Sequence, residues 1–292
     1  MIFSQFPKFY TGVENRKEHL LKICYSAFYF AVTFIGLHYV GHAISTANAW
    51  DLGYHPLFSY ARMESLAGTV NWTVNKVAMV YLAPPIWGLV VSVLAIIAYR
   101  MTEGKQTHLK TLFYWLGLNG YLLYFSYLVT GILSGQDYSS TMFTGFASYY
   151  AWLEWGAGKI YGIIAVQMLL SLPYVVFFSK GVLQLNYSRL LAAKNNGKSV
   201  IFLNVIVAPF FIGAALIILT TFPMDAGYQV VRLLCYLPIF IIIFLGMGFY
   251  RAKHISIVRG GLKPVSLVAI SILIALLLAS RVGLQASVQP FW

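Results

Sequence analysis

The sequence predicts an all-α protein: a polytopic transmembrane helical bundle of about seven spans, with its N-terminus in the cytoplasm and its C-terminus outside. Two observations predict this class, namely the composition and the way charge alternates between apolar runs. Hydrophobic residues make up 60% of the 292 residues and charged residues 10%, whereas a soluble globular chain carries about 25% charged residues. The mean hydropathy is +0.75. A water-soluble fold of this length has too small an interior for so much apolar surface.

Seven apolar stretches are long enough to cross the hydrocarbon core of a bilayer, which is about 30 Å thick and takes about 20 helical residues. They are predicted at Ile23–Thr46, Val77–Tyr99, Thr111–Ser134, Ile160–Ser179, Val200–Phe222, Tyr228–Tyr250 and Val265–Leu284.

Basic residues separate these spans in strict alternation. Fifteen of the 20 Lys and Arg precede the first span or follow the second, fourth and sixth: Lys8, Arg16, Lys17, Lys22, Arg100, Lys105, Lys110, Lys180, Arg189, Lys194, Lys198, Arg251, Lys253, Arg259 and Lys263. Because basic loops stay in the cytoplasm, this side is assigned to the cytoplasm and the chain to the plasma (inner) membrane. The net charge of +12 is therefore explained by the basic loops that orient the chain in a lipid bilayer, and no nucleic-acid partner is expected.

The predicted spans divide the chain into three parts. Residues 1–22 form a basic cytoplasmic segment, residues 23–284 a single transmembrane domain, and residues 285–292 a short outside tail. Two long outside segments, 47–76 and 135–159, interrupt the domain. The first is expected to be a re-entrant hairpin or an interfacial loop, and the aromatic residues of the second are expected to anchor it at the headgroups. The two cysteines lie in apolar runs and imply neither a disulfide framework nor a Cys metal site.

Ionisable side chains inside a membrane are costly, so each one is a candidate functional residue. His38 and His42 are four residues apart, which places both imidazoles on one helix face at a spacing that lets them share a metal ion. The alternative is that both rings hydrogen-bond to neighbouring helices or to interfacial water. Asp225 follows Pro223 at the predicted outer end of the fifth span, at a depth similar to the histidines. These three side chains are candidate zinc ligands that leave a fourth position open for water; alternatively, Asp225 caps the next helix.

Three segments resemble, in the same order, motifs of the site-2 proteases, which are intramembrane zinc metalloproteases. Residues 36–43, Gly-Leu-His-Tyr-Val-Gly-His-Ala, resemble the family's HExGH helix. Residues 82–88, Leu-Ala-Pro-Pro-Ile-Trp-Gly, resemble the stretch that opens a later core helix. Residues 222–227, Phe-Pro-Met-Asp-Ala-Gly, resemble the segment that provides the third metal ligand. The resemblance implies a zinc site formed by His38, His42 and Asp225.

The sequence also departs from the family pattern. Tyr39 stands where the family has its general-base glutamate, and a phenol with a pKa near 10 is a poor base at neutral pH. The asparagine expected before the aspartate segment is absent, and the predicted orientation of the first span is opposite to the usual one.

A few further residues are candidate accessory groups. His55 lies on the predicted metal side and is a candidate extra ligand. Glu64 in the same outside segment, or alternatively Glu154 in the second one, is a candidate substitute for the missing base. Arg232 follows Asp225 by two helical turns; it either pairs with Asp225 or extends toward the membrane interface, and the second arrangement is the one we predict.

Two functions from different classes follow. The first is a metalloprotease-like membrane protein, with lost or altered peptidase activity, that binds or regulates a transmembrane protein or peptide; any remaining activity would be that of a membrane-embedded hydrolase. The alternative is a transporter or a structural subunit of a membrane assembly, favoured by prolines in or near the spans. A haem protein or membrane oxygenase is disfavoured, because six histidines with one HxxxH pair are too few.

Overall fold

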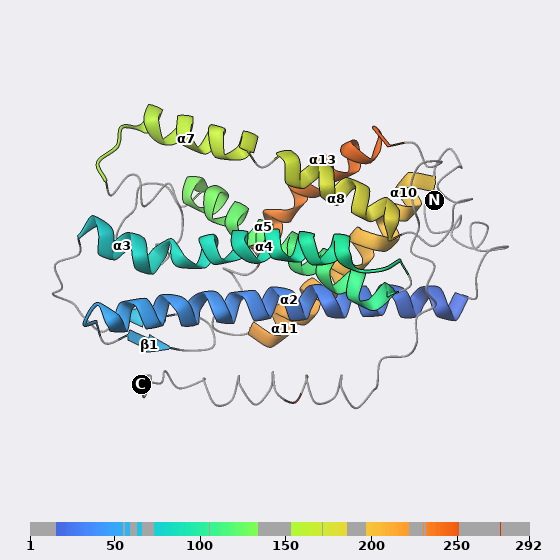
Figure 1. Cartoon of the computed structure of the whole chain (residues 1–292), viewed down its shortest axis with the longest axis horizontal. Helices are drawn as coiled ribbons and strands as arrows, with labels where there is room; N and C mark the ends of the chain where they lie inside the picture. Colours follow the sequence, from blue (N-terminus) through green and yellow to red (C-terminus); the bar gives the residue numbers. More distant parts are fainter. Residues whose placement is uncertain are drawn as a thin grey trace.

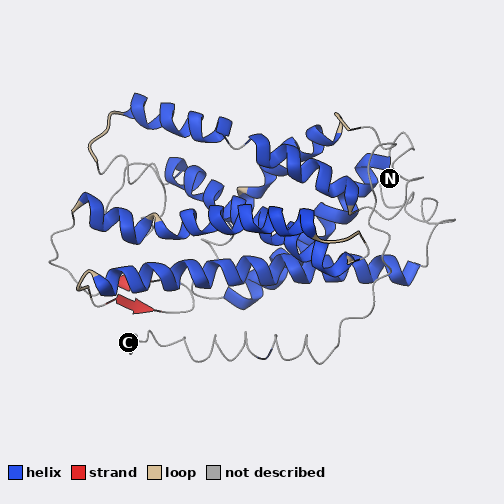
Figure 2. Cartoon of the chain, viewed as in Figure 1, coloured by secondary structure: helices blue, strands red, loops and turns tan. Residues whose placement is uncertain are grey.

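The computed structural model describes residues 16–54, 56–58, 63–65, 73–104, 106–133, 153–170, 172–185, 197–221, 230, 232–250 and 275. The helices are α2 (Arg16–Asp51), α3 (Val74–Tyr81), α4 (Ala83–Met101), α5 (Thr107–Leu133), α7 (Ala157–Leu170), α8 (Leu172–Gln184), α10 (Gly197–Phe202), the π-helical turn η2 (Leu203–Val207), α11 (Ala208–Thr221) and α13 (Tyr236–Met247). Helices α2, α3, α4 and α7 run along the long axis of the molecule, whereas α13 and the segment from α10 to α11 are inclined to it (Figures 1 and 2). Two short strands, β1 (Pro56–Phe58) and β2 (Met63–Ser65), pair antiparallel with Pro56 opposite Ser65.

Four helical segments in this part of the chain are long and apolar enough to cross a membrane: Leu20–Asp51, Ala83–Met101, Tyr161–Gln184 and Gly197–Thr220. A shorter apolar helix spans Arg232–Met247. The helical, multi-pass membrane character predicted from the sequence is therefore supported. The count of seven spans and the orientation of the termini stay predictions, and the predicted span Val265–Leu284 lies outside the described residues apart from Ala275.

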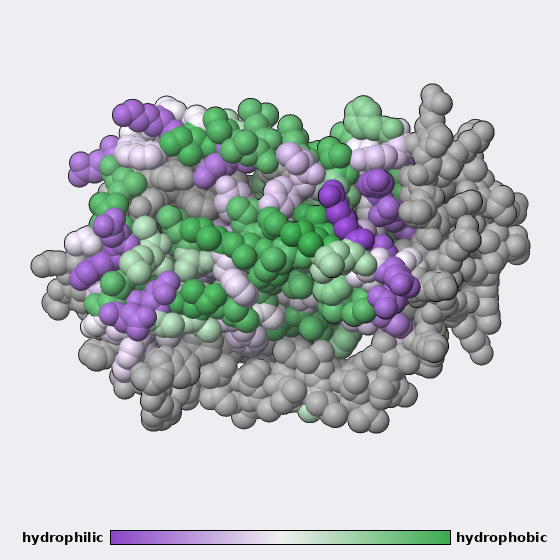
Figure 3. Space-filling model, viewed as in Figure 1, coloured by the Kyte–Doolittle hydropathy of each residue, from purple (hydrophilic) through white to green (hydrophobic). Residues whose placement is uncertain are grey.

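The outward faces of the helices are as apolar as their inward faces. On α13, Ile239 and Ile243 are buried while Ile241 and Leu245 are exposed by about 60%. In a soluble protein the exposed face of such a helix would be polar. Figure 3 shows the same pattern across one face of the molecule, where hydrophobic residues fill the middle and hydrophilic ones gather toward both ends. This surface suits a hydrocarbon environment with polar headgroups at each end.

Helix ends depart from the predicted boundaries at several places, and the first two spans show this clearly. The predicted span Ile23–Thr46 lies inside α2, which continues to Asp51. The predicted span Val77–Tyr99 is divided between α3 and α4 at Leu82. Pro84 and Pro85 occupy the first turn of α4, where the missing backbone N–H groups would have no helical partner. The two prolines therefore begin a new helix where we predicted the interior of one.

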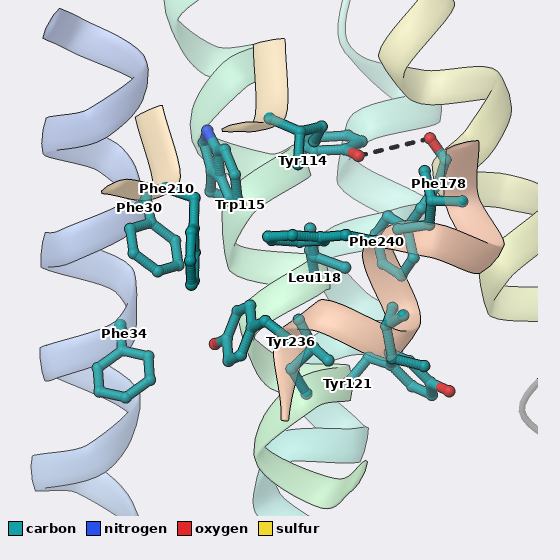
Figure 4. Close-up of a cluster of buried hydrophobic side chains, with 14 of the residues drawn as sticks. Phe30, Phe34, Tyr114, Trp115, Leu118, Tyr121, Phe178, Phe210, Tyr236 and Phe240 are labelled. Carbon is teal, nitrogen blue, oxygen red and sulfur yellow. Dashed lines mark hydrogen bonds between the residues drawn. The ribbon is translucent and has the colours of Figure 1, made fainter. Parts of the chain in front are cut away.

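Helix α5 lies at the centre of the bundle. No residue from Lys110 to Tyr127 is exposed, and α5 packs against α2, α4 and α8. Its side chains Trp115, Leu118 and Tyr121 form the middle of an aromatic core that α2, α8, α11 and α13 complete (Figure 4).

Small residues let α4 and α5 approach at backbone distance. A Cβ atom added to Gly120 would lie 2.5 Å from the Gly88 carbonyl oxygen and 3.0 Å from the Ser92 backbone nitrogen. The Ser92 hydroxyl donates a 2.7 Å hydrogen bond to the Gly117 carbonyl in the same contact. Such close contacts replace the hydrophobic driving force that is missing between helices in lipid.

Candidate functional site

The two histidines of α2 lie one above the other on the same helix face, as the four-residue spacing predicts. Their ring centroids are 4.3 Å apart and the planes are inclined at 74°. His38 is buried, whereas His42 is partly exposed. His38 therefore lies in the interior of the bundle, and His42 lies at a more accessible position one turn closer to the C-terminal end of α2.

Arg232 lies against His38 in the interior. Its Nη1 atom is 2.8 Å from His38 Nδ1, only 3% of the residue is exposed, and its Cζ atom lies 5.1 Å from the centroid of the Phe34 ring. The prediction that Arg232 extends toward the membrane interface is therefore wrong. The imidazole supplies a hydrogen-bond acceptor and the ring face supplies a cation–π contact, which together offset part of the cost of burying the charge.

The contact between these two side chains fixes the state of His38. A guanidinium remains protonated in proteins and offers only donors. His38 Nδ1 is then the acceptor, so a neutral His38 carries its proton on Nε2. Metal-binding histidines usually have the opposite arrangement, in which the nitrogen remote from the metal donates to a carboxylate, carbonyl or water.

The predicted third ligand, Asp225, lies outside the described residues, as does the candidate extra ligand His55. Glu64 is in β2, where it pairs with Leu57. Tyr39, at the position of the family's glutamate, is half-buried beside His38, with ring centroids 6.1 Å apart. Within the described ranges, no group of three or more His, Cys, Asp or Glu side chains is placed to hold a metal ion. The zinc site of His38, His42 and Asp225 thus remains a hypothesis.

Two of the three motif segments meet in the structure. A Cβ atom added to Gly41, which precedes the second histidine, would lie 3.1 Å from Pro84 Cβ in the proline-containing segment. Gly41 therefore allows α2 to pass close to the beginning of α4. This packing explains the small residue between the histidines without reference to a metal.

A second set of polar side chains lies one to two helical turns away and was not singled out from the sequence. Asn119 of α5 donates to the Phe30 carbonyl and to Thr33 Oγ1 on α2, and it accepts a hydrogen bond from the Tyr236 hydroxyl. Tyr236 is one turn after Arg232, so the two polar contacts share a face of the same helical segment. Asn119 is the only amide side chain in the predicted span Thr111–Ser134. A lone amide in an apolar span is a sequence signal from which its role in interhelical hydrogen bonding could have been predicted.

Comparisons with known proteins found no matching family model, no similar curated protein and no similar solved structure.

Proposed function

We propose that the chain is a multi-pass membrane protein, similar to the site-2 proteases in the order of its motifs, that binds a transmembrane partner without hydrolysing it. The binding site is the polar centre formed by His38, His42 and Arg232. The observation that carries this proposal is the 2.8 Å contact between Arg232 Nη1 and His38 Nδ1 inside the bundle.

The chemistry of this contact disfavours zinc-dependent hydrolysis. The guanidinium occupies the lone pair of Nδ1, and Nε2 of the neutral ring carries a proton, so neither nitrogen is available as a ligand. A buried positive charge beside the ring also repels a divalent cation. Tyr39 supplies no carboxylate to take a proton from a metal-bound water.

The same chemistry favours binding of acceptor groups. A neutral His38 with its proton on Nε2 and the guanidinium of Arg232 both carry N–H groups of the kind that carboxylate and carbonyl oxygens accept. An arginine inside a membrane protein usually marks a binding site or pathway, because burying it without use is expensive. A transmembrane segment with an acidic side chain, or with a helix break that frees carbonyl groups, fits these donors.

Zinc content and peptidase activity test the non-hydrolytic part of the proposal. We expect the protein, purified without chelators, to contain less than about a tenth of an equivalent of zinc, given that a catalytic site holds one. We also expect neither the native chain nor Tyr39→Glu to cleave a transmembrane substrate. One equivalent of zinc that His42→Ala removes, together with cleavage by the native chain, would overturn the proposal.

Peptide binding tests the partner class. A transmembrane peptide with one central Asp is compared with its Leu counterpart, using the full-length protein in nanodiscs. A charge-assisted hydrogen bond is worth about 1.5–3 kcal/mol, so we expect the Asp peptide to bind at least about tenfold more tightly. The preference should disappear in Arg232→Met and persist in Arg100→Gln, where a basic residue at the end of α4 is removed instead. Equal binding of both peptides to the native protein would contradict the assignment.

A transporter is a second candidate, favoured by the interruption of one spanning helix. The π-helical turn Leu203–Val207 separates α10 from α11 and precedes Pro209. Interrupted helices line substrate sites in many transporters, and π-helical turns occur often at functional positions. Protein-dependent flux of a small organic acid into proteoliposomes would favour this candidate over a binding protein.

A further inference from the structure

We infer that the end of the bundle formed by α4, α5 and α8 carries a binding site for an anionic phospholipid. The site is built around two aromatic rings, Tyr99 of α4 and Phe177 of α8, whose centroids are 5.5 Å apart. The Tyr99 hydroxyl donates a 3.1 Å hydrogen bond to Gln184 Oε1 of α8, which fixes the two helix ends relative to each other.

Two basic side chains lie against this aromatic pair. Lys110 Nζ is 4.5 Å from the centroid of the Tyr99 ring and 3.4 Å from the Tyr99 carbonyl oxygen. Arg100 Cζ is 5.5 Å from the centroid of the Phe177 ring. Cation–π contacts hold both charges close to the helix ends while their N–H groups remain able to donate.

A third base completes the site from α8. Lys180 follows Phe177 by three residues and precedes Gln184 by four, so it shares their helix face. Both Lys180 and Arg100 are exposed, and Lys110 is half-buried. The turn after α4 contains one acid, Glu103, which is also exposed. Among the residues that the structure describes here, Arg100, Lys110 and Lys180 therefore outnumber Glu103, and the sequence has one more base, Lys105, between Glu103 and Lys110.

Apolar surface adjoins these bases on the side of the membrane. Ile97, one turn before Arg100, is 49% exposed, and Val176, one turn before Lys180, is 56% exposed. A free anion would use only the basic residues, whereas a phospholipid uses both features. Its phosphate lies among the three bases and its acyl chains lie along α4 and α8, which is the usual arrangement of a basic lipid site between transmembrane helices.

Native mass spectrometry of the full-length protein tests this site, with phosphatidylglycerol as the probe and phosphatidylcholine as the neutral comparison. Each basic residue near a membrane surface changes the affinity about fivefold. We therefore expect Arg100→Gln/Lys180→Gln to bind phosphatidylglycerol about 25-fold more weakly, with phosphatidylcholine binding unchanged. Glu103→Gln should strengthen binding, because it removes a negative charge from the turn that follows Arg100. Both substituted bases are exposed, so the variants are expected to fold.

Lys159→Gln is the matched control, because Lys159 is an exposed base on α7 at the predicted outer side. The inference is overturned if this control weakens phosphatidylglycerol binding as much as the double variant does. It is also overturned if millimolar inorganic phosphate displaces the lipid completely and shortening the acyl chains changes nothing, because the site would then recognise the ion alone.

Discussion

The Tyr236 hydroxyl donates a 2.9 Å hydrogen bond to Asn119 Oδ1 and thereby joins α13 to α5 in the interior of the bundle. The Asn119 amide also donates to the Phe30 carbonyl at 2.9 Å and to Thr33 Oγ1 at 2.7 Å. A single buried amide thus connects three helices. In a protein whose helices are apolar on all sides, such contacts specify which faces meet.

Replacing Asn119 with Leu should destabilise the bundle by about 2 kcal/mol, because three interhelical hydrogen bonds are lost at roughly 0.6 kcal/mol each. Tyr236→Phe, which removes one of them, should cost about a third as much. Reversible unfolding in mixed micelles measures both. Thr111→Val is the control, since the Thr111 hydroxyl bonds to the Thr107 carbonyl of its own helix. A loss for Asn119→Leu no greater than that of the control would show that the amide does not join the helices.

The contact between α4 and α5 predicts a strong dependence on the size of residue 120. In Gly120→Ala, the added methyl group meets the Gly88 carbonyl oxygen and the Ser92 backbone, which cannot move aside as a side chain can. We expect a loss of about 1–3 kcal/mol in unfolding free energy. Gly36→Ala on α2 meets nothing within 4 Å and should instead stabilise the protein by up to about 1 kcal/mol. Equal effects of the two variants would contradict the close approach.

The sequence was sufficient to place apolar helices and insufficient to orient them. Hydrophobic runs located α2, α4 and α11 because hydropathy depends on length and composition alone. The buried face of α13 was not predictable, since Ile241 and Leu245 on its exposed side are as apolar as Ile239 and Ile243 on its buried side. The contact of His38 with Arg232 joins residues 194 positions apart. The prediction for Arg232 failed for this reason. The residues next to Arg232 in the sequence did not indicate that its guanidinium would contact an imidazole and an aromatic ring of α2.

Lys198 is expected to stabilise the C-terminal end of α13. Its Nζ atom lies 2.9 Å from the Tyr250 carbonyl oxygen and 3.3 Å from the carbonyl oxygen of Gly248, the C-cap of α13, where the chain leaves the helix and carbonyl groups have no helical partner. Lys198→Met should cost about 0.3–1 kcal/mol and accelerate amide hydrogen exchange over residues 244–250. Lys159→Met removes the same charge from α7 and should leave that exchange unchanged. Identical exchange in the native protein and Lys198→Met would rule out the capping role.

Arg232 should suppress metal binding by the two histidines of α2. In Arg232→Met the guanidinium no longer occupies His38 Nδ1, and its repulsion of a divalent cation is removed. The imidazoles, with centroids 4.3 Å apart, can then share an ion as a pair spaced one helical turn apart. We expect affinity for Co²⁺, followed by its visible absorption, to rise at least about tenfold over the native protein, which corresponds to about 1.4 kcal/mol.

Arg232→Lys keeps a cation beside the ring and should retain the low affinity for Co²⁺, while His42→Ala in the Arg232→Met background should abolish the gain in affinity. Adding Asp225→Asn to that background reports whether the aspartate supplies a third ligand. Native protein that binds Co²⁺ as tightly as Arg232→Met would show that the guanidinium does not control the histidine pair.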